Sequence, residues 1–347
     1  MKKALTLILT LALILSLVAC GGAPAASKAP AASKAPAASG AAPAATEKAS
    51  VKFGNTGGED DIQTMALREV ATRLDKETGG NFAAEVYPSS SLGDTDDLAE
   101  QAMQGAAVLT ISDPSRLASF VKDYGILGMP YIFDDYKGLD KLMKTDLYAT
   151  WEKAFADQGI WLVTSNWFSG TRNFACDVVV NKPEDLKGQR IRTMGNDLCI
   201  KSVTEMGAVA TPMSWSEVYT SIQQKALDGA EVQTPSFYAT RLWEVTKVIN
   251  RTGHFQLIGS AVSGTKFRDS LSADYQQLFT KTFQEVGTEY QQKCVDLSTK
   301  YEKEMVEKYG LTINEDVDVQ AFKDATAPVY DELGYADIKA QLQSEMG

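Results

Sequence analysis

The feature that most constrains the fold is a long apolar stripe between residues 273 and 309. Apolar side chains recur there every three or four residues, which is the spacing of one face of an α-helix. They are Tyr275, Phe279, Phe283, Val286, Tyr290, Cys294, Leu297, Tyr301 and Met305. At 1.5 Å per residue this helix would be about 55 Å long, more than one lobe of about 150 residues needs. A coiled coil is the alternative, but the stripe has no strict heptad. We therefore predict a helix that braces two lobes.

Upstream of this helix, short apolar strands alternate with amphipathic helices. The predicted strands cover residues 52–55, 82–87, 106–111, 159–165, 178–180 and 189–193. Helices are predicted over residues 60–76, from an N-cap at Asp94, through Val203 and Met206, and from a Ser-Trp-Ser-Glu capping box at residues 214–217. Strands separated by single helices are typical of open sheets with parallel strands, so the predicted fold class is α/β.

The first 19 residues have the pattern of an export signal. Lys2 and Lys3 precede an apolar run over residues 4–18, and Ala19 then precedes Cys20. About 15 apolar residues are too few for a membrane span, which needs about 20, so we predict a signal peptide over residues 1–19 rather than a span or a core helix. The end of this run resembles a bacterial lipobox. That resemblance implies a lipid on Cys20 and an extracytoplasmic protein, anchored at the outer face of the cell membrane or in the periplasm.

Residues 20–49 are predicted to form an unstructured tether. Residues 25–30 (Ala-Ala-Ser-Lys-Ala-Pro) recur as residues 31–36, and such a stretch has few side chains to bury. The remaining body, residues 50–347, is long enough for two lobes. The whole chain has a net charge of −11; five lysines and one glutamate precede the body, which therefore carries −15. This charge opposes binding to nucleic acid or to anionic lipid surfaces.

The sequence offers little for catalysis. His254 is the one histidine in the chain, and there is no G-x-S-x-G, no H-E-x-x-H and no glycine-rich phosphate loop. Residues 94–97 begin like a calcium loop but lack its glycine and glutamate, so we interpret them as acidic residues at a helix N-terminus. No two of the four cysteines have the spacing of a C-x-x-C motif. We predict no enzymatic activity, no metal and no cofactor; an anchored hydrolase is the least favoured alternative.

Arginines in a glycine-rich context are the candidate ligand residues. Arg172 follows Gly170-Thr171, and Arg192 shares one side of a predicted strand with Arg190. A guanidinium group pairs well with a carboxylate because its planar fork donates two parallel hydrogen bonds. Surface salt bridges are the alternative explanation, since they account for most arginines.

Several ordered motifs resemble the DctP-like solute-binding proteins of TRAP (tripartite ATP-independent periplasmic) transporters. They are Tyr87-Pro-Ser-Ser-Ser-Leu-Gly93, Met129-Pro-Tyr-Ile-Phe133, Asp185-Leu-Lys-Gly-Gln-Arg-Ile-Arg192, Glu205-Met-Gly-Ala208, Thr211-Pro-Met-Ser-Trp-Ser-Glu-Val-Tyr219 and Asp228-Gly-Ala-Glu231. The resemblance implies a two-lobed periplasmic-binding-protein-like fold with a hinge and a long lobe-spanning helix. Lobe I is expected over residues 50–169 with part of 258–297, and lobe II over residues 170–257 with part of 298–347.

The same resemblance implies a ligand site. Arg192 matches the family's arginine that pairs with the ligand carboxylate, and Arg172 matches its second ligand arginine. Trp215 falls at an aromatic position that lines the pocket, and Asp113 lies where members often place a polar ligand contact. This chain lacks the asparagine of the family's D-G-x-E-N-P motif, and Gln233 is predicted to replace it.

The resulting prediction is a monomeric binding protein that captures a small organic acid and delivers it to a TRAP permease. A ligand-binding subunit of a membrane sensor is the alternative. A uronate or aldonate is favoured over a C4-dicarboxylate, because Asp113 can accept hydrogen bonds from hydroxyls but would repel a second carboxylate. Trp215, Trp167 and Phe168 are expected to form a flat apolar wall suited to a sugar ring.

Overall fold

The computed structural model describes residues 47–347. The predicted signal peptide over residues 1–19, the lipidation at Cys20 and nearly all of the tether over residues 20–49 lie outside the described residues. Among residues 47–347, none of the helices has the length and apolar character needed to cross a membrane.

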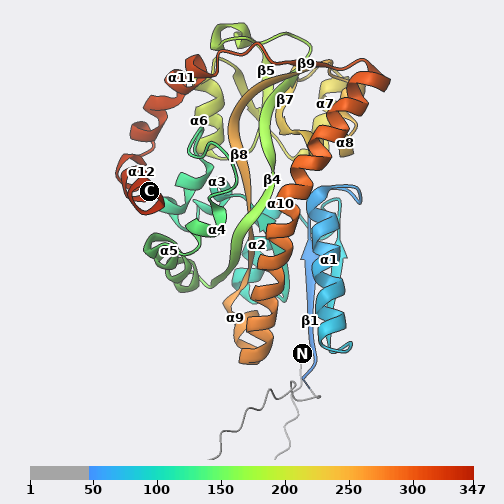
Figure 1. Cartoon of the computed structure of the whole chain (residues 1–347), viewed down its shortest axis with the longest axis vertical. Coiled ribbons are helices and arrows are strands. Elements are labelled where there is room, and N and C mark those ends of the chain that lie inside the picture. Colours follow the sequence, from blue (N-terminus) through green and yellow to red (C-terminus); the bar gives the residue numbers. More distant parts are fainter. Residues whose placement is uncertain (1–46) are drawn as a thin grey trace, which may run out of the picture. The chain divides into compact units, whose positions relative to one another are not determined.

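The described residues form one nine-stranded mixed sheet with helices packed around it (Figure 1). The strand order is β2-β1-β3-β8-β4-β7-β5-β6, and β9 pairs with β8. The strands are β1 Ala49–Gly54, β2 Phe82–Tyr87, β3 Val108–Ser112, β4 Ile160–Cys176, β5 Arg190–Thr193, β6 Val209–Pro212, β7 Gly229–Gln233, β8 Val248–Gly264 and β9 Thr312–Asn314. The helices are α1 Ile62–Glu77, α2 Thr95–Gln104, α3 Pro114–Leu117, α4 Leu139–Leu142, α5 Asp146–Asp157, α6 Asp197–Glu205, α7 Val218–Gln223, α8 Thr234–Ala239, α9 Thr265–Asp269, α10 Ala273–Tyr309, α11 Val319–Glu332 and α12 Ala336–Met346.

Strands β4 and β8, each 17 residues long, connect the two lobes. Lobe I comprises β2, β1 and β3, and it uses the first half of β4 and the second half of β8. Lobe II comprises β7, β5, β6 and β9, and it uses the other halves of the same two strands. The β4–β8 pair is antiparallel, as are β3–β8 and β4–β7. The predicted parallel strands are therefore present within a mixed sheet: β1–β2, β1–β3, β5–β6, β5–β7 and β8–β9 pair in parallel.

The β4–β8 pairing is irregular where the strands pass from one lobe to the other. Its register shifts between Phe168 and Thr171, beside the predicted lobe boundary at residues 169/170, which stays a prediction. Gly170 lies in this irregular stretch with φ +121°, and a Cβ there would lie 2.9 Å from the Cβ of Gln233. Glycine is therefore required at this position both by the backbone and by the close approach of β7.

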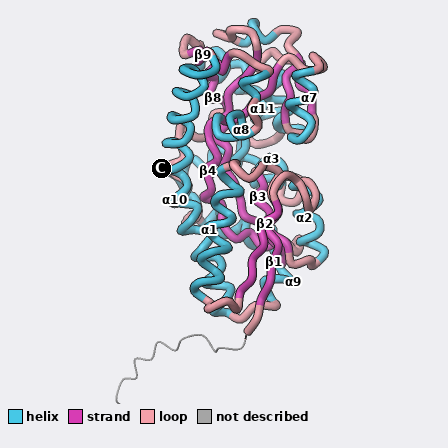
Figure 2. The backbone as a smooth tube through the Cα atoms, turned by 90° about the vertical axis from the view of Figure 1, so that its right-hand side faces the viewer, coloured by secondary structure: helices cyan, strands magenta, loops and turns pink. Residues whose placement is uncertain are grey.

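Helix α10 extends from Ala273 to Tyr309, as the apolar stripe predicts, and lies along one side of the sheet (Figure 2). It begins after the cap residue Ser272 and ends at Gly310, which has a left-handed backbone with φ 69°. Its N-terminal half supplies Phe279 and Phe283 to the core of lobe I, while Met305 belongs to an apolar cluster of lobe II. One helix thus shares its apolar face between the two lobes.

Two local predictions were wrong. Residues 178–180 form no strand, because the chain leaves the sheet after Cys176 and the Val180 N–H donates instead to the side chain of Asn250 at 2.7 Å. Ser214 does not cap the following helix; its hydroxyl donates to Asp94 at 3.1 Å, on the other lobe. The predicted cap at Asp94 is confirmed, and together with Asp97 it forms a capping box at the start of α2.

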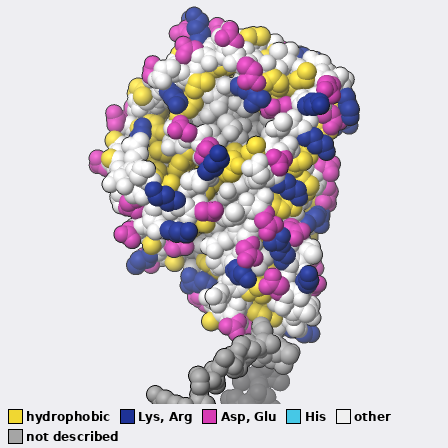
Figure 3. Space-filling model, in the orientation of Figure 1, with side chains coloured by type: hydrophobic (Ala, Val, Ile, Leu, Met, Phe, Trp, Pro, Cys, Tyr) yellow, Lys and Arg dark blue, Asp and Glu magenta, His cyan; other side chains and the backbone are white. Residues whose placement is uncertain are grey.

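Acidic and basic side chains are interspersed over the molecular face shown in Figure 3, without a basic patch.

Candidate functional site

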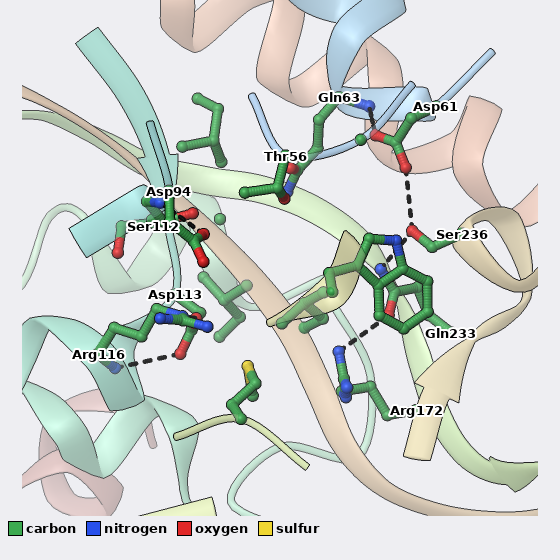
Figure 4. A pocket seen from close by; sticks show the side chains of 18 of the residues that line it. Thr56, Asp61, Gln63, Asp94, Ser112, Asp113, Arg116, Arg172, Gln233 and Ser236 are labelled. Atoms are coloured by element: carbon green, nitrogen blue, oxygen red, sulfur yellow. Dashed lines mark hydrogen bonds and ion pairs between the residues drawn. The ribbon is translucent and has the colours of Figure 1, made fainter. Parts of the chain in front are cut away.

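A cavity of about 90 Å³ lies between the two lobes, bordered by the N-termini of α1 and α2, the end of β3, strands β5 and β7, and the middle of β8. A cavity of this size suits a small molecule rather than a peptide or polymer. Asp61, Ser236, Gln233 and Arg172 lie along one side, and Asp94, Ser112, Asp113 and Arg116 along the other (Figure 4). All five predicted ligand residues line this cavity: Arg172, Arg192, Trp215, Asp113 and Gln233.

Arg192 is a buried cation without an anionic partner. It lies on β5 with 2 % of its surface exposed, and its Nε and Nη2 donate to the carbonyl oxygen of Met213 at 3.0 and 2.9 Å. Within residues 47–347, no carboxylate lies within 4.0 Å of it. Burial, and then the charge of Arg172, lowers the pKa of Arg192 to about 10. The Trp215 ring centre is 5.2 Å from the guanidinium carbon, which fits a cation–π contact.

Arg172 is also buried, but its charge is neutralised. It forms an ion pair with Glu231 on β7, and its Nη2 donates to the Glu231 carbonyl oxygen at 2.6 Å. Its Nη1 donates to Oε1 of Gln233 at 3.0 Å. Burial by itself would raise the pKa of Glu231, but the charge and hydrogen bond of Arg172, together with the neighbouring His254, outweigh burial and lower the pKa to about 2. Arg172 therefore holds the Gln233 side chain in place, and the positive charge of Arg172 is already neutralised by Glu231.

His254 lies next to this ion pair and is fully buried on β8. Its Nδ1 shares a hydrogen bond with the Thr252 hydroxyl at 2.8 Å, whereas its Nε2 is 3.7 Å from Glu231, too far for a hydrogen bond. Burial lowers the pKa of His254, so the imidazole is neutral at pH 7. The carboxylate of Glu231 thus pairs with Arg172 rather than with His254.

Asp113 lines the cavity, but most of its acceptor capacity is used. It caps helix α3 by accepting the Arg116 N–H at 3.2 Å, and it also accepts the hydroxyl of Ser115. Its other oxygen lies 3.2 Å from Nε of Arg116. Arg116, which sequence reasoning missed, forms a second ion pair with Asp96. The Asp-x-x-Arg spacing at the start of a helix was the available signal, since residues three apart are neighbours on a helix.

Asp61, also missed from the sequence, is a buried carboxylate in the same cavity. It is the N-cap of α1, with 5 % of its surface exposed, and accepts the Gln63 N–H at 2.9 Å. Its second oxygen accepts the Ser236 hydroxyl at 3.0 Å. Burial raises the pKa of Asp61, although these hydrogen bonds oppose the shift. The sequence signal was an aspartate directly before an amphipathic helix, which by itself indicates only a cap.

Polar contacts join the lobes across the cavity. Ser236 on α8 donates to Asp61 on lobe I, and Ser214 donates to Asp94 at 3.1 Å. The Asn196 amide at the start of α6 donates to the Ser115 hydroxyl at 2.9 Å. The two lobes are therefore in contact around the cavity.

The expected aromatic wall is only partly present. Trp215 lines the cavity, but Trp167 packs on Phe283 and donates its Nε1–H to the Phe283 carbonyl oxygen at 2.9 Å. Phe168 stacks on Tyr136 with ring centres 4.8 Å apart, outside the cavity lining. Both side chains are therefore core residues, because they point from β4 towards α10 and its neighbours rather than into the cavity.

Residues 53–337 match the protein family described as bacterial extracellular solute-binding protein, family 7 (DctP). The chain belongs to this family. It is 26% identical over 240 residues to the C4-dicarboxylate-binding periplasmic protein DctP of Vibrio cholerae, covering 69% of this chain and 72% of that protein. It is 28% identical over 282 residues to the 2,3-diketo-L-gulonate-binding periplasmic protein of Escherichia coli K12, covering 80% and 84%.

Solved structures agree with this assignment. The TRAP periplasmic solute-binding protein from Ochrobacterium anthropi with bound L-fuconate superposes with a TM-score of 0.82 at 27% identity, covering 86% of this chain and all of that one. The predicted DctP family and the two-lobed α/β fold are confirmed. As a member of the family, the protein is an extracytoplasmic solute-binding protein of the TRAP type and not an enzyme.

Proposed function

We propose that this protein captures a small hydroxylated monocarboxylate, a sugar acid such as a uronate or aldonate, and delivers it to a TRAP-type permease. The observation that carries the proposal is the buried, unpaired guanidinium of Arg192. A buried cation without an anionic partner is unfavourable, so the site gains free energy when a carboxylate supplies the missing charge. Two donors of Arg192 are held by Met213, which fixes the direction of the guanidinium plane before a ligand arrives.

The charges of the three cavity arginines favour one ligand carboxylate rather than two. Arg172 is paired with Glu231, and Arg116 with Asp96 and Asp113. Arg192 alone among these three has no carboxylate partner. A C4-dicarboxylate would bring a second negative charge with no free cation to meet it.

The relatives reported above differ in the ligand that they bind. The Ochrobacterium anthropi and Escherichia coli proteins bind sugar acids, and the Vibrio cholerae protein binds C4-dicarboxylates. The cavity of this protein supports the first kind, because neutral hydrogen-bonding groups line it beyond Arg192, among them Thr56, Gln63, Ser112 and Gln233. Asp113 contributes less than expected to this preference, since it is engaged by Arg116.

The proposed mechanism is closure of the two lobes around the anion. The ligand carboxylate would bind Arg192, with Trp215 against one face and Gln233 held in place by Arg172. Closure excludes water, and a charge pair is stronger in the drier site. We propose the hinge at the irregular β4–β8 crossing near Gly170, with α10 bracing both lobes.

We further propose that the protein is a lipid-anchored monomer, attached through Cys20. Growth with a radiolabelled fatty acid tests the anchor: the wild-type protein is expected to incorporate label, and Cys20→Ala is expected to incorporate none. Equal labelling of the two proteins would contradict the proposal.

Calorimetric titration of Arg192→Ala tests the ligand site. With sugar acids that bind the wild-type protein, the loss of a buried charge-assisted pair is expected to cost about 2–5 kcal/mol. This corresponds to about 30- to 4,000-fold weaker binding. Arg190→Ala is the matched control, because Arg190 lies two residues away on β5 but pairs with Asp228 at the surface. Near wild-type affinity in Arg192→Ala would refute the assignment.

A further inference from the structure

We propose that Asp61 determines which ligands this site accepts: it takes a hydrogen bond from a ligand hydroxyl and excludes a second acid group. This inference rests on the proposed function and narrows its ligand class. Asp61 belongs to lobe I and Arg192 to lobe II, so the two charges enter the cavity from different lobes.

The first observation is that Asp61 has only neutral partners. It accepts hydrogen bonds from the Gln63 N–H at 2.9 Å, the Ser236 hydroxyl at 3.0 Å and the Asn55 amide at 3.4 Å. None of its contacts within residues 47–347 is an ion pair with Lys, Arg or His. An ionised carboxylate has about four acceptor positions, so three donors leave room for one more.

A second observation is the hydroxyl of Ser112. It borders the same cavity at the end of β3, is buried, and has no hydrogen-bond partner within residues 47–347. A buried hydroxyl without a partner is unfavourable, and a ligand hydroxyl can both donate to and accept from it. A polyhydroxylated chain extending from Arg192 would therefore satisfy groups that the protein leaves unpaired.

The orientation of Asp61 is set by a chain of donors that begins in lobe II. Arg172 donates to Gln233 at 3.0 Å, Gln233 donates to Ser236 at 2.7 Å, and Ser236 donates to Asp61 at 3.0 Å (Figure 4). Gln233 and Ser236 each accept one hydrogen bond and donate the next, so Asp61 is the terminal acceptor. A second ligand carboxylate would face Asp61, which accepts hydrogen bonds, but an ionised carboxylate has no hydrogen to donate. The two negative charges would also repel each other.

Matched pairs of acids test this inference, because the members of each pair differ only in a terminal CH₂OH or carboxylate. The pairs are D-galactonate and galactarate, D-gluconate and D-glucarate, and D-erythronate and meso-tartrate, each titrated calorimetrically at pH 7.5. For the wild-type protein, the monoacid of at least one pair is expected to bind about tenfold or more tightly than its diacid.

In Asp61→Asn this preference is expected to shrink by about tenfold or more, because the amide removes the repulsion and can donate to a carboxylate. Asparagine caps helices as well as aspartate does, so helix α1 should persist in this variant. The affinities for the two acids of a pair are measured on the same preparation, so their ratio does not depend on the fraction of folded protein. Asp60→Asn is the control: it removes the same charge from the neighbouring exposed residue, and its preference should stay within about twofold of wild type.

The outcomes separate this inference from the proposed function. An unchanged preference in Asp61→Asn, with binding of both acids lost in Arg192→Ala, would overturn the role of Asp61 and leave the proposed function standing. A wild-type protein that prefers the diacids would overturn the role of Asp61 as well. Binding that survives Arg192→Ala, or binding of neither the six acids nor a uronate, would overturn the proposed function and this inference with it.

Discussion

Replacing Glu231 with glutamine should destabilise the protein and strengthen its attraction for anions. The substitution keeps the shape of the side chain but leaves the buried Arg172 without its counter-charge. Breaking a buried ion pair from one side costs about 3–5 kcal/mol of unfolding free energy. The pKa of Glu231, lowered from 4.5 to about 2, gives a similar value, on the order of 3 kcal/mol at 1.36 kcal/mol per pKa unit.

The pH dependence of this loss has a definite sign. The folded-state pKa of Glu231 is depressed, so the native state binds fewer protons than the unfolded state between pH 4.5 and about 2. The stabilisation by the ion pair is therefore complete above pH 4.5 and disappears as pH falls towards 2. The difference in stability between wild type and Glu231→Gln should be largest near pH 7 and should shrink through this acidic range.

Urea denaturation at several pH values measures both effects. Asp228→Asn is the matched control, because Asp228 directly precedes the same strand and pairs with Arg190 at the surface, where an ion pair contributes about 0–1 kcal/mol. A bound sugar acid should raise the stability of Glu231→Gln by more than that of wild type, since two unpaired arginines would then face the cavity. If Glu231→Gln loses no more stability than Asp228→Asn, the inference that Glu231 neutralises the charge of Arg172 is wrong.

Two further predictions concern the core. Gly287→Ala should lower stability by about 1–3 kcal/mol despite the better helix propensity of alanine, because the added Cβ would lie 2.5 Å from Cδ1 of Trp167; an increase in urea midpoint would contradict this. The three cysteines of the body are unpaired and buried, which raises their pKa values to about 11 or 12. In a Cys20→Ala variant at pH 8, they should react with a thiol reagent only after unfolding, and rapid labelling of the native protein would refute this.

Features that depend on local pattern were predictable from the sequence. The apolar stripe predicted both ends of α10, and Asp94 was recognised as a cap, because helix period and capping involve residues within a few positions of each other. The family resemblance likewise identified Arg192 and Trp215 as cavity residues.

The full length of β4 was not predictable. The predicted strand over residues 159–165 corresponds only to its first part, whereas β4 continues to Cys176. Nearly all residues of this strand are buried, polar ones such as Asn166 and Asn173 included, so the sequence lacks the alternation of a half-exposed strand. The rest of the fold covers both faces of β4.

The charge balance of the cavity was decided by tertiary structure alone. Arg172 meets Glu231 across 59 positions of sequence, and Ser236 meets Asp61 across 175. Sequence motifs identify arginines that are suited to an acid ligand, but they do not show which of them a distant carboxylate has already neutralised. The pairing of β4 with β7 compensates Arg172, and the docking of α1 beside α8 buries Asp61. Because the Coulomb interaction depends on distance and burial, only the folded chain leaves Arg192 without a carboxylate partner among the three cavity arginines of residues 47–347.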